Sequence, residues 1–167
     1  MSLLLLALLG DPAFALDASV GLASGAQLHT GPQALAVGLG ASATFRLYLG
    51  PSVAAHAKLG FMAYGPPFAQ LDVGALYRFR PEAAWRPAVG GELATTWGGK
   101  TRILDGTEGW TSPRTPLLGV RAVLRPLSFE KEAWTVSPLT LSVGGGLDAI
   151  GRTLSVGVEL LAVERRI

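Results

Sequence analysis

A strict alternation of residue types is the feature of this chain that most restricts its fold. From Leu35 to Leu49 every second residue is apolar, and the residues between them are small, polar or charged. A period of two places successive side chains on opposite faces of a strand, whereas a helix repeats every 3.6 residues. Alternating segments of about ten residues, separated by turn residues, are typical of a transmembrane β-barrel whose outer face meets lipid.

Eight segments of the chain carry this pattern. Turns such as Gly50-Pro51 and Gly65-Pro66-Pro67 separate them, because glycine and proline interrupt strand ladders. Pro138 and the glycines at 144–146 predict a bulge or bend in the seventh segment. We therefore predict an all-β fold, an eight-stranded antiparallel up-and-down transmembrane β-barrel, with the even strand number of bacterial single-chain barrels. The expected strands cover residues 16–26, 34–49, 52–63, 68–79, 85–97, 116–127, 134–147 and 153–163.

Composition agrees with one apolar domain whose apolar residues are spread by alternation. The chain has 167 residues, of which 49% are hydrophobic and 16% are charged, against roughly 25% charged in soluble domains. No apolar run reaches the length of about 18 residues that a spanning helix needs. The net charge of +2 is dispersed, which argues against a nucleic-acid partner. The absence of cysteine excludes disulfides and thiolate metal sites.

The first fifteen residues have the pattern of an export signal. An apolar core from Leu3 to Leu9 is followed by Gly10 and Pro12, and then by the triplet Ala13-Phe14-Ala15. This pattern predicts a signal peptide over residues 1–15, cleaved after Ala15, and a barrel domain over residues 16–167. The basic residues that normally precede the core are missing, so an ordinary apolar first strand or a short buried helix remains an alternative.

Strand alternation also predicts the orientation of individual side chains. A shift of one residue would move every side chain of a strand to the opposite face, so each strand offers two discrete arrangements. The apolar set is expected to face lipid, and the small and charged set to face the lumen. Test positions are Leu39, Val73, Val120 and Val158 outward, and Gly40, Gly74, Arg121 and Glu159 inward.

Aromatic residues cluster near the expected strand ends. In membrane barrels, aromatic side chains form girdles at the two interfaces, where an amphipathic ring lies at the level of the lipid headgroups. The alternative is that the rings plug the ends of the core. The expected girdle residues are Phe45, Tyr77, Phe79, Trp85 and Trp134 at the periplasmic rim, and Phe61 and Trp97 at the outer rim.

The inward positions carry many charges. Eight strands leave an interior just wide enough to be filled by side chains, and buried charges persist only when they are paired. We expect a packed ionic network, with Glu92 and Glu159 among Lys58, Arg121 and Arg125; a gated ion path through the network is the alternative. The expected lumen network is Arg46, Lys58, Asp72, Arg78, Arg86, Glu92, Arg121, Arg125 and Glu159.

One long segment, residues 98–115, escapes the alternation. Strand parity places it on the outward side of the barrel, together with the other connections after odd-numbered strands. Binding residues concentrate on loops that a rigid scaffold holds, so this loop is the expected contact for a surface or envelope protein partner. The candidate interaction residues are Lys100, Arg102, Asp105, Glu108, Trp110 and Arg114.

This chain combines an export signal, eight expected strands, tight inner turns and lumen-facing residues that are small or charged. In this combination it resembles the small outer-membrane β-barrel proteins. These include the OmpA-type membrane domain and the OmpX or Ail type. The likeness extends over nearly the whole chain as a pattern, and it includes Ser155, Gly157, Leu160 and Ala162 of the last strand. Such chains usually end on an aromatic residue, whereas this one ends on Ile167. The resemblance implies a bacterial outer-membrane protein, in contact with outer-membrane lipid, with a structural or surface-interaction role.

Catalytic residues are scarce. Outer-membrane barrels that resemble this one include a lipid A deacylase and a palmitoyltransferase, and a serine hydrolase needs a base and an orienting acid beside its serine. The chain has only His29, expected in a turn, and His56, which lacks the His-x-Ser spacing of the deacylase. Neither has a second histidine or cysteine at metal-ligand spacing. We predict no enzymatic activity, metal or cofactor; a soluble lipocalin-like ligand-binding barrel and a narrow ion-conducting pore are the alternatives.

Overall fold

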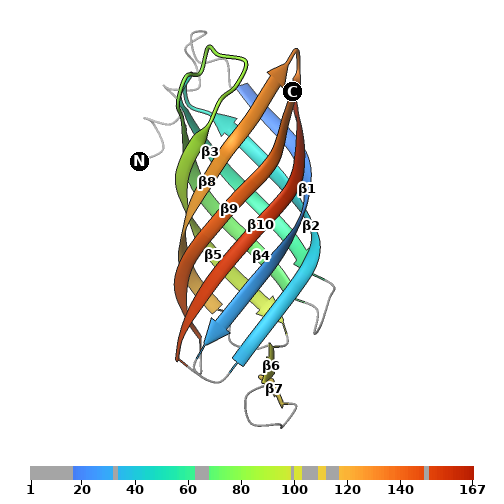
Figure 1. Ribbon diagram of the computed structural model, residues 1–167, viewed down its shortest axis with the longest axis vertical. Coiled ribbons are helices and arrows are strands. Elements are labelled where there is room, and N and C mark those ends of the chain that lie inside the picture. The colour runs from blue at the N-terminus through green and yellow to red at the C-terminus, as the bar shows by residue number, and fades with distance from the viewer. Residues whose placement is uncertain are drawn as a thin grey trace, which may run out of the picture.

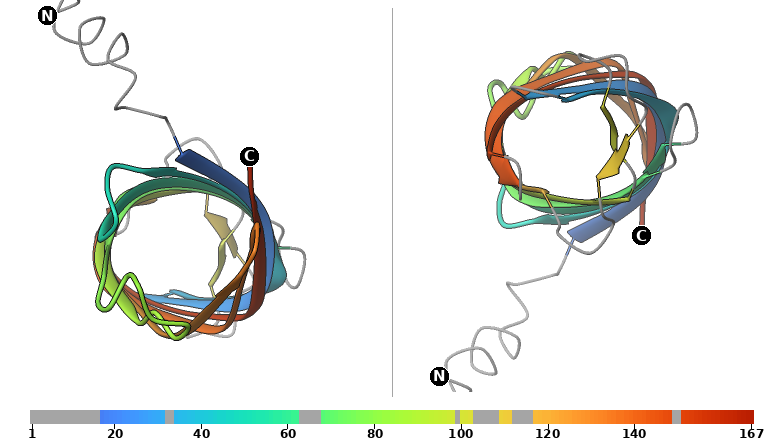
Figure 2. Two further views of the ribbon diagram at one scale, coloured as in Figure 1. Left: turned by 90° about the horizontal axis from the view of Figure 1, so that it is seen from above. Right: turned by 90° about the horizontal axis from the view of Figure 1, so that it is seen from below.

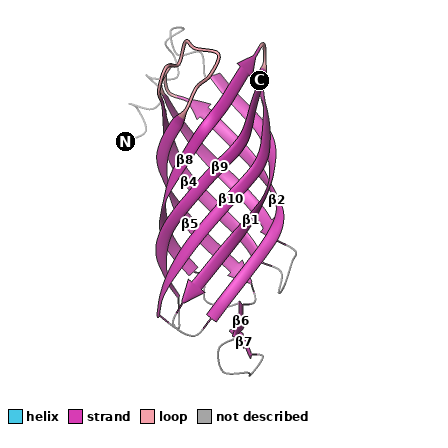
Figure 3. Ribbon diagram, in the orientation of Figure 1, coloured by secondary structure: helices cyan, strands magenta, loops and turns pink. Residues whose placement is uncertain are grey.

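The computed structural model describes residues 17–31, 34–62, 68–98, 100–102, 109–111, 117–148 and 151–167. Strands are the only regular elements within these ranges (Figure 3). None of the described residues belongs to a helix that is long and apolar enough to cross a membrane. The strands are β1 (Asp17–Gly31), β2 (Ala34–Tyr48), β3 (Val53–Met62), β4 (Phe68–Arg78), β5 (Ala88–Gly98), β6 (Lys100–Arg102), β7 (Gly109–Thr111), β8 (Leu117–Lys131), β9 (Trp134–Asp148) and β10 (Gly151–Arg166).

Eight of these strands form a closed antiparallel barrel (Figures 1 and 2). The order around the barrel is β1-β10-β9-β8-β5-β4-β3-β2, and pairing between β10 and β1 closes it. Strands β6 and β7 form a separate hairpin. The predicted eight-stranded antiparallel fold is therefore confirmed, and closure leaves no unpaired edge strand in the barrel.

The strands are staggered, and this stagger decides which side chains meet in the lumen. Following the paired residues once around the barrel from Arg46 in β2 leads back to Ala36 in the same strand, ten residues away. Stagger of this kind tilts the strands relative to the barrel axis, as Figure 1 shows. Side chains that meet in the lumen therefore include residues that are not paired in the ladder, such as Lys58 and Glu159.

The apolar side chains point outward. In β8, Leu118 and Val120 are 57% and 63% exposed, whereas Arg121 between the outward residues is 2% exposed. Leu39 and Val73 are likewise exposed, Val158 is partly exposed, and Glu159 contacts Lys58 in the lumen. A hypothetical Cβ on Gly74 would approach the Glu92 side chain, so Gly74 also faces inward. This orientation excludes a lipocalin-like barrel, in which the apolar face surrounds an internal ligand.

The end of the barrel that carries Asp17 and Ile167 is called the terminal end, and the opposite end, beyond which β6 and β7 lie, is called the hairpin end (Figure 1). The connections at 49–52, 79–87 and 132–133 all lie at the terminal end. Strands β1, β3, β5 and β9 end at the hairpin end, which agrees with the predicted parity. The connection at 79–87 is longer than the tight turn we expected there.

Several strand boundaries differ from the prediction. Strand β1 continues to Gly31, because its ladder with β2 extends to the pair Gly31 and Ala34. The prediction that His29 lies in a turn was therefore wrong, since it is a buried residue of β1. Strand β8 runs through the expected charged turn as far as Lys131. Conversely, β5 begins only at Ala88, and β10 extends over residues 151–166.

A β-bulge at Leu161 reverses the alternation in the last strand. Leu161 has a φ of 66°, and the register between β1 and β10 shifts beside it. Leu160 and Leu161 are both exposed, while Ala162 and Glu164 are buried. Strict alternation would place Glu164 on the outer face; the extra residue of the bulge turns it into the lumen.

The glycines of β9 do not form the bend that the sequence suggested. Their pairing with β8 is continuous from Gly144, opposite Arg121, to Gly146. The register shifts instead nearer the terminal end, on both sides of the pair Leu127–Leu139, where β8 contains Pro126 and β9 contains Pro138. Proline lacks the N–H that the ladder would use, which accounts for the irregularity at that place.

Candidate functional site

A central ionic cluster fills the middle of the lumen. Its members are Lys58, Asp72, Glu92, Arg121 and Glu159, from five different strands. Lys58 Nζ lies 2.7 Å from Glu159 Oε1 and 3.3 Å from Asp72 Oδ2. Arg121 contacts Asp72 and lies 2.9 Å from Glu92 Oε1. Pairing between strands sets Lys58 opposite Asp72 and Glu92 opposite Arg121, so the ladder itself builds half of these contacts.

His56 lies beside the central cluster. The cluster holds three carboxylates, Lys58 and Arg121. His56 Nε2 lies 3.2 Å from Glu92 Oε2. Gln70 also donates a hydrogen bond to Asp72. Each buried charge of this cluster therefore has an ionic partner, as a buried charge requires.

A second group of charges lies nearer the terminal end and is centred on Glu164. Both terminal nitrogens of Arg46 contact the two oxygens of Glu164, at 2.5 and 2.6 Å. Arg125 NH1 lies 3.1 Å from Glu164 Oε1. Arg125 was expected beside Glu92 and Glu159; its direct ion pair is with Glu164, and Glu159 acts on it only at longer range. Sequence reasoning missed Glu164, whose inward orientation depends on the bulge at Leu161.

The mouth of the lumen at the terminal end is lined by further arginines around Glu130. Glu130 contacts Arg86, and its carboxylate oxygens lie 3.1 Å from Arg166 and 4.0 Å from Arg78. The Tyr48 ring has the Arg78 guanidinium at 4.5 Å and that of Arg166 at 5.1 Å. Arg86 lies in the connection before β5 and not in a strand as predicted. Glu130 escaped prediction because its segment had the composition of a turn.

Toward the hairpin end the lumen is filled by apolar and neutral polar groups. Met62, Phe68 and Leu117 are buried. His29 Nδ1 lies 2.7 Å from Ser155 Oγ, and the Phe68 ring contacts the His29 ring edge-on at 5.5 Å. Sequence reasoning did not bring this histidine and serine together. The described residues contain no cluster of three His, Cys, Asp or Glu side chains able to hold a metal ion.

The outer wall carries exposed aromatic residues toward both ends. Two cations stack on this wall near the terminal end: the guanidiniums of Arg80 and Arg165 lie 5.8 Å and 5.6 Å from the Trp85 and Trp134 ring centres. Phe129 is a further exposed ring that the sequence analysis did not include. The exposed predicted girdle residues are Phe45, Tyr77, Phe79, Trp85 and Trp134 toward the terminal end, and Phe61 and Trp97 toward the hairpin end.

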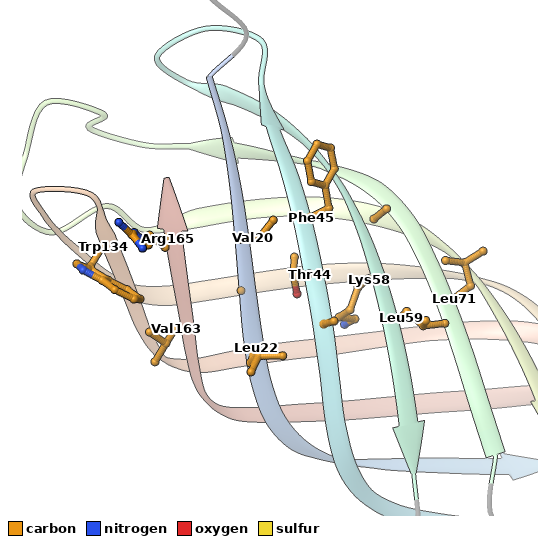
Figure 4. Close-up of a pocket in the computed structure, with 13 residues that line it drawn as sticks. Val20, Leu22, Thr44, Phe45, Lys58, Leu59, Leu71, Trp134, Val163 and Arg165 are labelled. Atoms are coloured by element: carbon orange, nitrogen blue, oxygen red, sulfur yellow. The ribbon is translucent and has the colours of Figure 1, made fainter. Parts of the chain in front are cut away.

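A shallow groove of about 740 Å³ crosses the outer wall (Figure 4). It extends from Trp134 and Arg165, at the terminal end, across β10, β1, β2 and β3 to Leu71 of β4. Its depth comes from the small side chains of Ala43 and Ala57 between larger neighbours. The groove is an apolar surface with a single outward-facing cation, Arg165, at one end.

The predicted interaction loop contains the β6–β7 hairpin. Thr101 pairs with Trp110, and the hairpin lies beyond the barrel end, within the barrel outline when seen along the axis (Figures 1 and 2). Gly98, expected in this loop, belongs to β5. The structure describes only the backbone of Lys100, Arg102 and Trp110. Three other candidates, Asp105, Glu108 and Arg114, lie outside the described residues, as does the expected signal peptide.

Comparison with known proteins identifies the fold. No family model and no curated protein matches the sequence. Neisserial surface protein A is similar in structure, with a TM-score of 0.71, 10% identity, and coverage of 90% of this chain and 97% of that chain. Ail of Yersinia pestis gives a TM-score of 0.58, with 12% identity and coverage of 91% and 99%. The N-terminal barrel domain of Pseudomonas aeruginosa OprF gives 0.56, with 17% identity and coverage of 89% and 97%. The chain therefore has the fold of the small eight-stranded outer-membrane β-barrels.

Proposed function

We propose that this chain is an integral protein of the bacterial outer membrane with a structural or surface-interaction role and no enzymatic activity. One observation carries the proposal: a continuous apolar outer wall surrounds a charged interior. Leu22, Leu59, Leu93 and Leu118 are each more than half exposed on that wall. A soluble monomer rarely exposes an apolar patch of more than a few hundred Å². In lipid the same wall is favourable, and a closed barrel leaves no strand edge unsatisfied.

The aromatic residues support the same placement. They lie toward the two barrel ends, with aliphatic residues such as Leu39 and Val120 between them. Girdles of this kind flank an apolar band about 25 Å tall in outer-membrane barrels. In this proposal the terminal end faces the periplasm, residues 1–15 direct export through the inner membrane, and the hairpin end faces outward.

The interaction role is assigned to the loop at the hairpin end. The loop is long, it contains a hairpin that stands beyond the barrel, and its sequence concentrates charges beside Trp110. Tryptophan and arginine are common at the centres of protein interfaces. Ail, which has the same fold, is known in complex with the heparin analogue sucrose octasulfate, so a ligand site on such a barrel has a precedent.

Burial supports the non-enzymatic assignment. His29 and Ser155 are close enough for a base and a nucleophile. Both are nevertheless at least nine-tenths buried, and Phe68 packs against the histidine. The other ring nitrogen of His29, Nε2, lies 3.2 Å from the amide oxygen of Gln27. A serine hydrolase usually has a carboxylate at this place. The second histidine, His56, contacts the Glu92 carboxylate inside the lumen.

Membrane placement is tested by fractionating cells and by gel migration in detergent with and without heating. We expect the protein in the outer-membrane fraction, with a folded form that migrates differently from the boiled form. Recovery in the soluble fraction, or identical migration, would contradict the proposal.

Orientation is tested with single cysteines, because the chain has none of its own. Thr107→Cys lies between β6 and β7, and Glu132→Cys is its matched control in the turn between β8 and β9 at the terminal end. A membrane-impermeant maleimide should label Thr107→Cys in intact cells and label Glu132→Cys only after the outer membrane is opened. The reverse pattern would show that the hairpin faces the periplasm.

A further inference from the structure

The lumen near the terminal end contains more positive than negative charge. Among the described residues, four arginines line a small cavity there: Arg46, Arg78, Arg86 and Arg125. In the part of the chain that the structure describes, two carboxylates form ion pairs with these arginines: Glu130, which also lines the cavity, and Glu164. In the described part of the chain, the three carboxylates of the central cluster form their ion pairs with Lys58 and Arg121 and not with these four arginines, and Glu159 acts on Arg125 only at longer range.

Three of these arginines are removed from water. Arg46, Arg78 and Arg125 are each at least nine-tenths buried. Water cannot screen a charge at such a site, so an unbalanced guanidinium there is costly unless another anion is present. Arg86 is more exposed, and solvent can balance it.

Hydrogen-bond donors without partners line the same cavity. In the described part of the chain, the Nε atoms of Arg46, Arg78 and Arg125 are buried and have no hydrogen-bond partner. Arg78 is the least satisfied of the three. Its nearest carboxylate oxygen among the described residues is 4.0 Å away on Glu130, and the hydrogen bond that it donates to the Gly50 carbonyl oxygen is 3.4 Å long. Its other contact is with the Tyr48 ring, at 4.5 Å.

Hydroxyl groups add further donors. Ser128, Tyr48 and Thr135 also line the cavity. Ser128 Oγ accepts a hydrogen bond from Ser137 Oγ at 3.1 Å, which leaves its own proton available. The cavity volume is about 10 Å³, which is the room of a single water-sized sphere.

We propose that the cavity between Arg46, Arg78 and Arg125 is a binding site for one small monovalent anion of the halide class, chloride under physiological conditions. A single negative charge balances the one buried guanidinium that Glu130 and Glu164 leave uncompensated. A monatomic anion comes closest to the size of the cavity and would require only small shifts of the surrounding side chains, whereas an oxyanion such as phosphate is too large for it. The bound ion would hold β2, β4 and β8 together at the terminal end of the lumen.

Crystallography with bromide tests the site directly. Crystals of the detergent-solubilised wild-type barrel are soaked in sodium bromide, and anomalous differences are measured at the bromine absorption edge. We expect a peak between the three guanidinium groups. Absence of a peak at this place, with bromide visible elsewhere on the protein, would overturn the proposal.

Stability in different salts tests the site in solution. Urea unfolding of the vesicle-reconstituted protein is compared in sodium chloride and in sodium gluconate at equal ionic strength, since gluconate is too large for the cavity. Chloride at ten times its Kd should raise the folding equilibrium constant about tenfold. An unchanged constant in the wild-type protein would contradict the proposal.

Matched arginine variants separate binding from general salt effects. Arg78→Gln removes a cavity donor and leaves the Arg46–Glu164–Arg125 contacts in place; Arg80→Gln removes an exposed arginine over Trp85 on the outer wall. The chloride response should disappear in Arg78→Gln and persist in Arg80→Gln. A full response in Arg78→Gln would refute the site. If that variant does not fold, Ser128→Ala, which removes only a neutral donor, must weaken the response, and the wild-type bromide peak remains decisive.

Discussion

Glu164→Gln is the substitution that best separates the observed lumen from the one that strict alternation would build. Glu164 is 2% exposed and is the common partner of two buried arginines, Arg46 and Arg125. The substitution removes the negative charge while keeping the size of the side chain. It leaves both guanidinium groups buried without a carboxylate.

The magnitude follows from the contacts that are lost. Removing one partner of a buried ion pair typically costs about 3–5 kcal/mol, because the remaining charge is uncompensated. Glutamine keeps one carbonyl oxygen that can accept a hydrogen bond from Arg46. We therefore expect a loss near the lower limit, about 3 kcal/mol in the free energy of unfolding, which is roughly a 150-fold change in the equilibrium constant.

The assay is urea unfolding in phospholipid vesicles, with the folded fraction measured by heat-modifiable migration. Glu132→Gln, in the exposed turn before β9, is the matched control and should change the stability by no more than about 0.5 kcal/mol. If Glu164 faced lipid, removing its charge would leave the barrel equally or more stable. A Glu164→Gln variant as stable as the wild-type protein would therefore refute the inward orientation and the bulge that produces it.

Four other perturbations test the barrel and its loop. Val120→Arg places a charge on the outer wall and should cost about 2–4 kcal/mol in the same unfolding assay if this position lies near the membrane midplane; no loss would contradict the lipid-facing assignment. Gly144→Ala would place a Cβ 2.0 Å from the Val120 carbonyl oxygen, whereas the nearest atom to a Cβ at Gly145 is 3.4 Å away, so only the first variant should be destabilised, by about 1–3 kcal/mol. The wild-type barrel should conduct weakly or not at all in planar bilayers because side chains fill its lumen; Glu92→Gln should destabilise it or admit ions, and large steady wild-type currents would favour a porin. Replacing Lys100 to Arg114 with a short Gly-Asn turn should leave the barrel folded while abolishing surface binding, as measured by heat-modifiable migration and a binding assay; failure to fold would make the segment structural.

Local pattern was sufficient for the fold class and for the faces of the regular strands. The alternation in β2, from Ala36 to Arg46, depends only on residues two positions apart, and the backbone of a strand turns that period into two faces. Glycine-proline turns marked most of the hairpin connections for the same reason, since their effect on the backbone is local. The count of eight barrel strands and the outward orientation of Leu39, Val73 and Val120 needed no tertiary information.

Only the tertiary structure decided where the pattern is interrupted and which charges meet. The bulge at Leu161 leaves no local signal that we recognised, yet it moves Glu164 from the outer face into the lumen. His29 continues a strand because β2 offers it a partner across the hairpin, although its own sequence resembles a turn. Closure with a ten-residue stagger brings together residues far apart in the chain, such as Lys58 with Glu159 and Arg46 with Glu164. These pairs depend on tilt and stagger, which belong to the closed barrel as a whole and to no single strand.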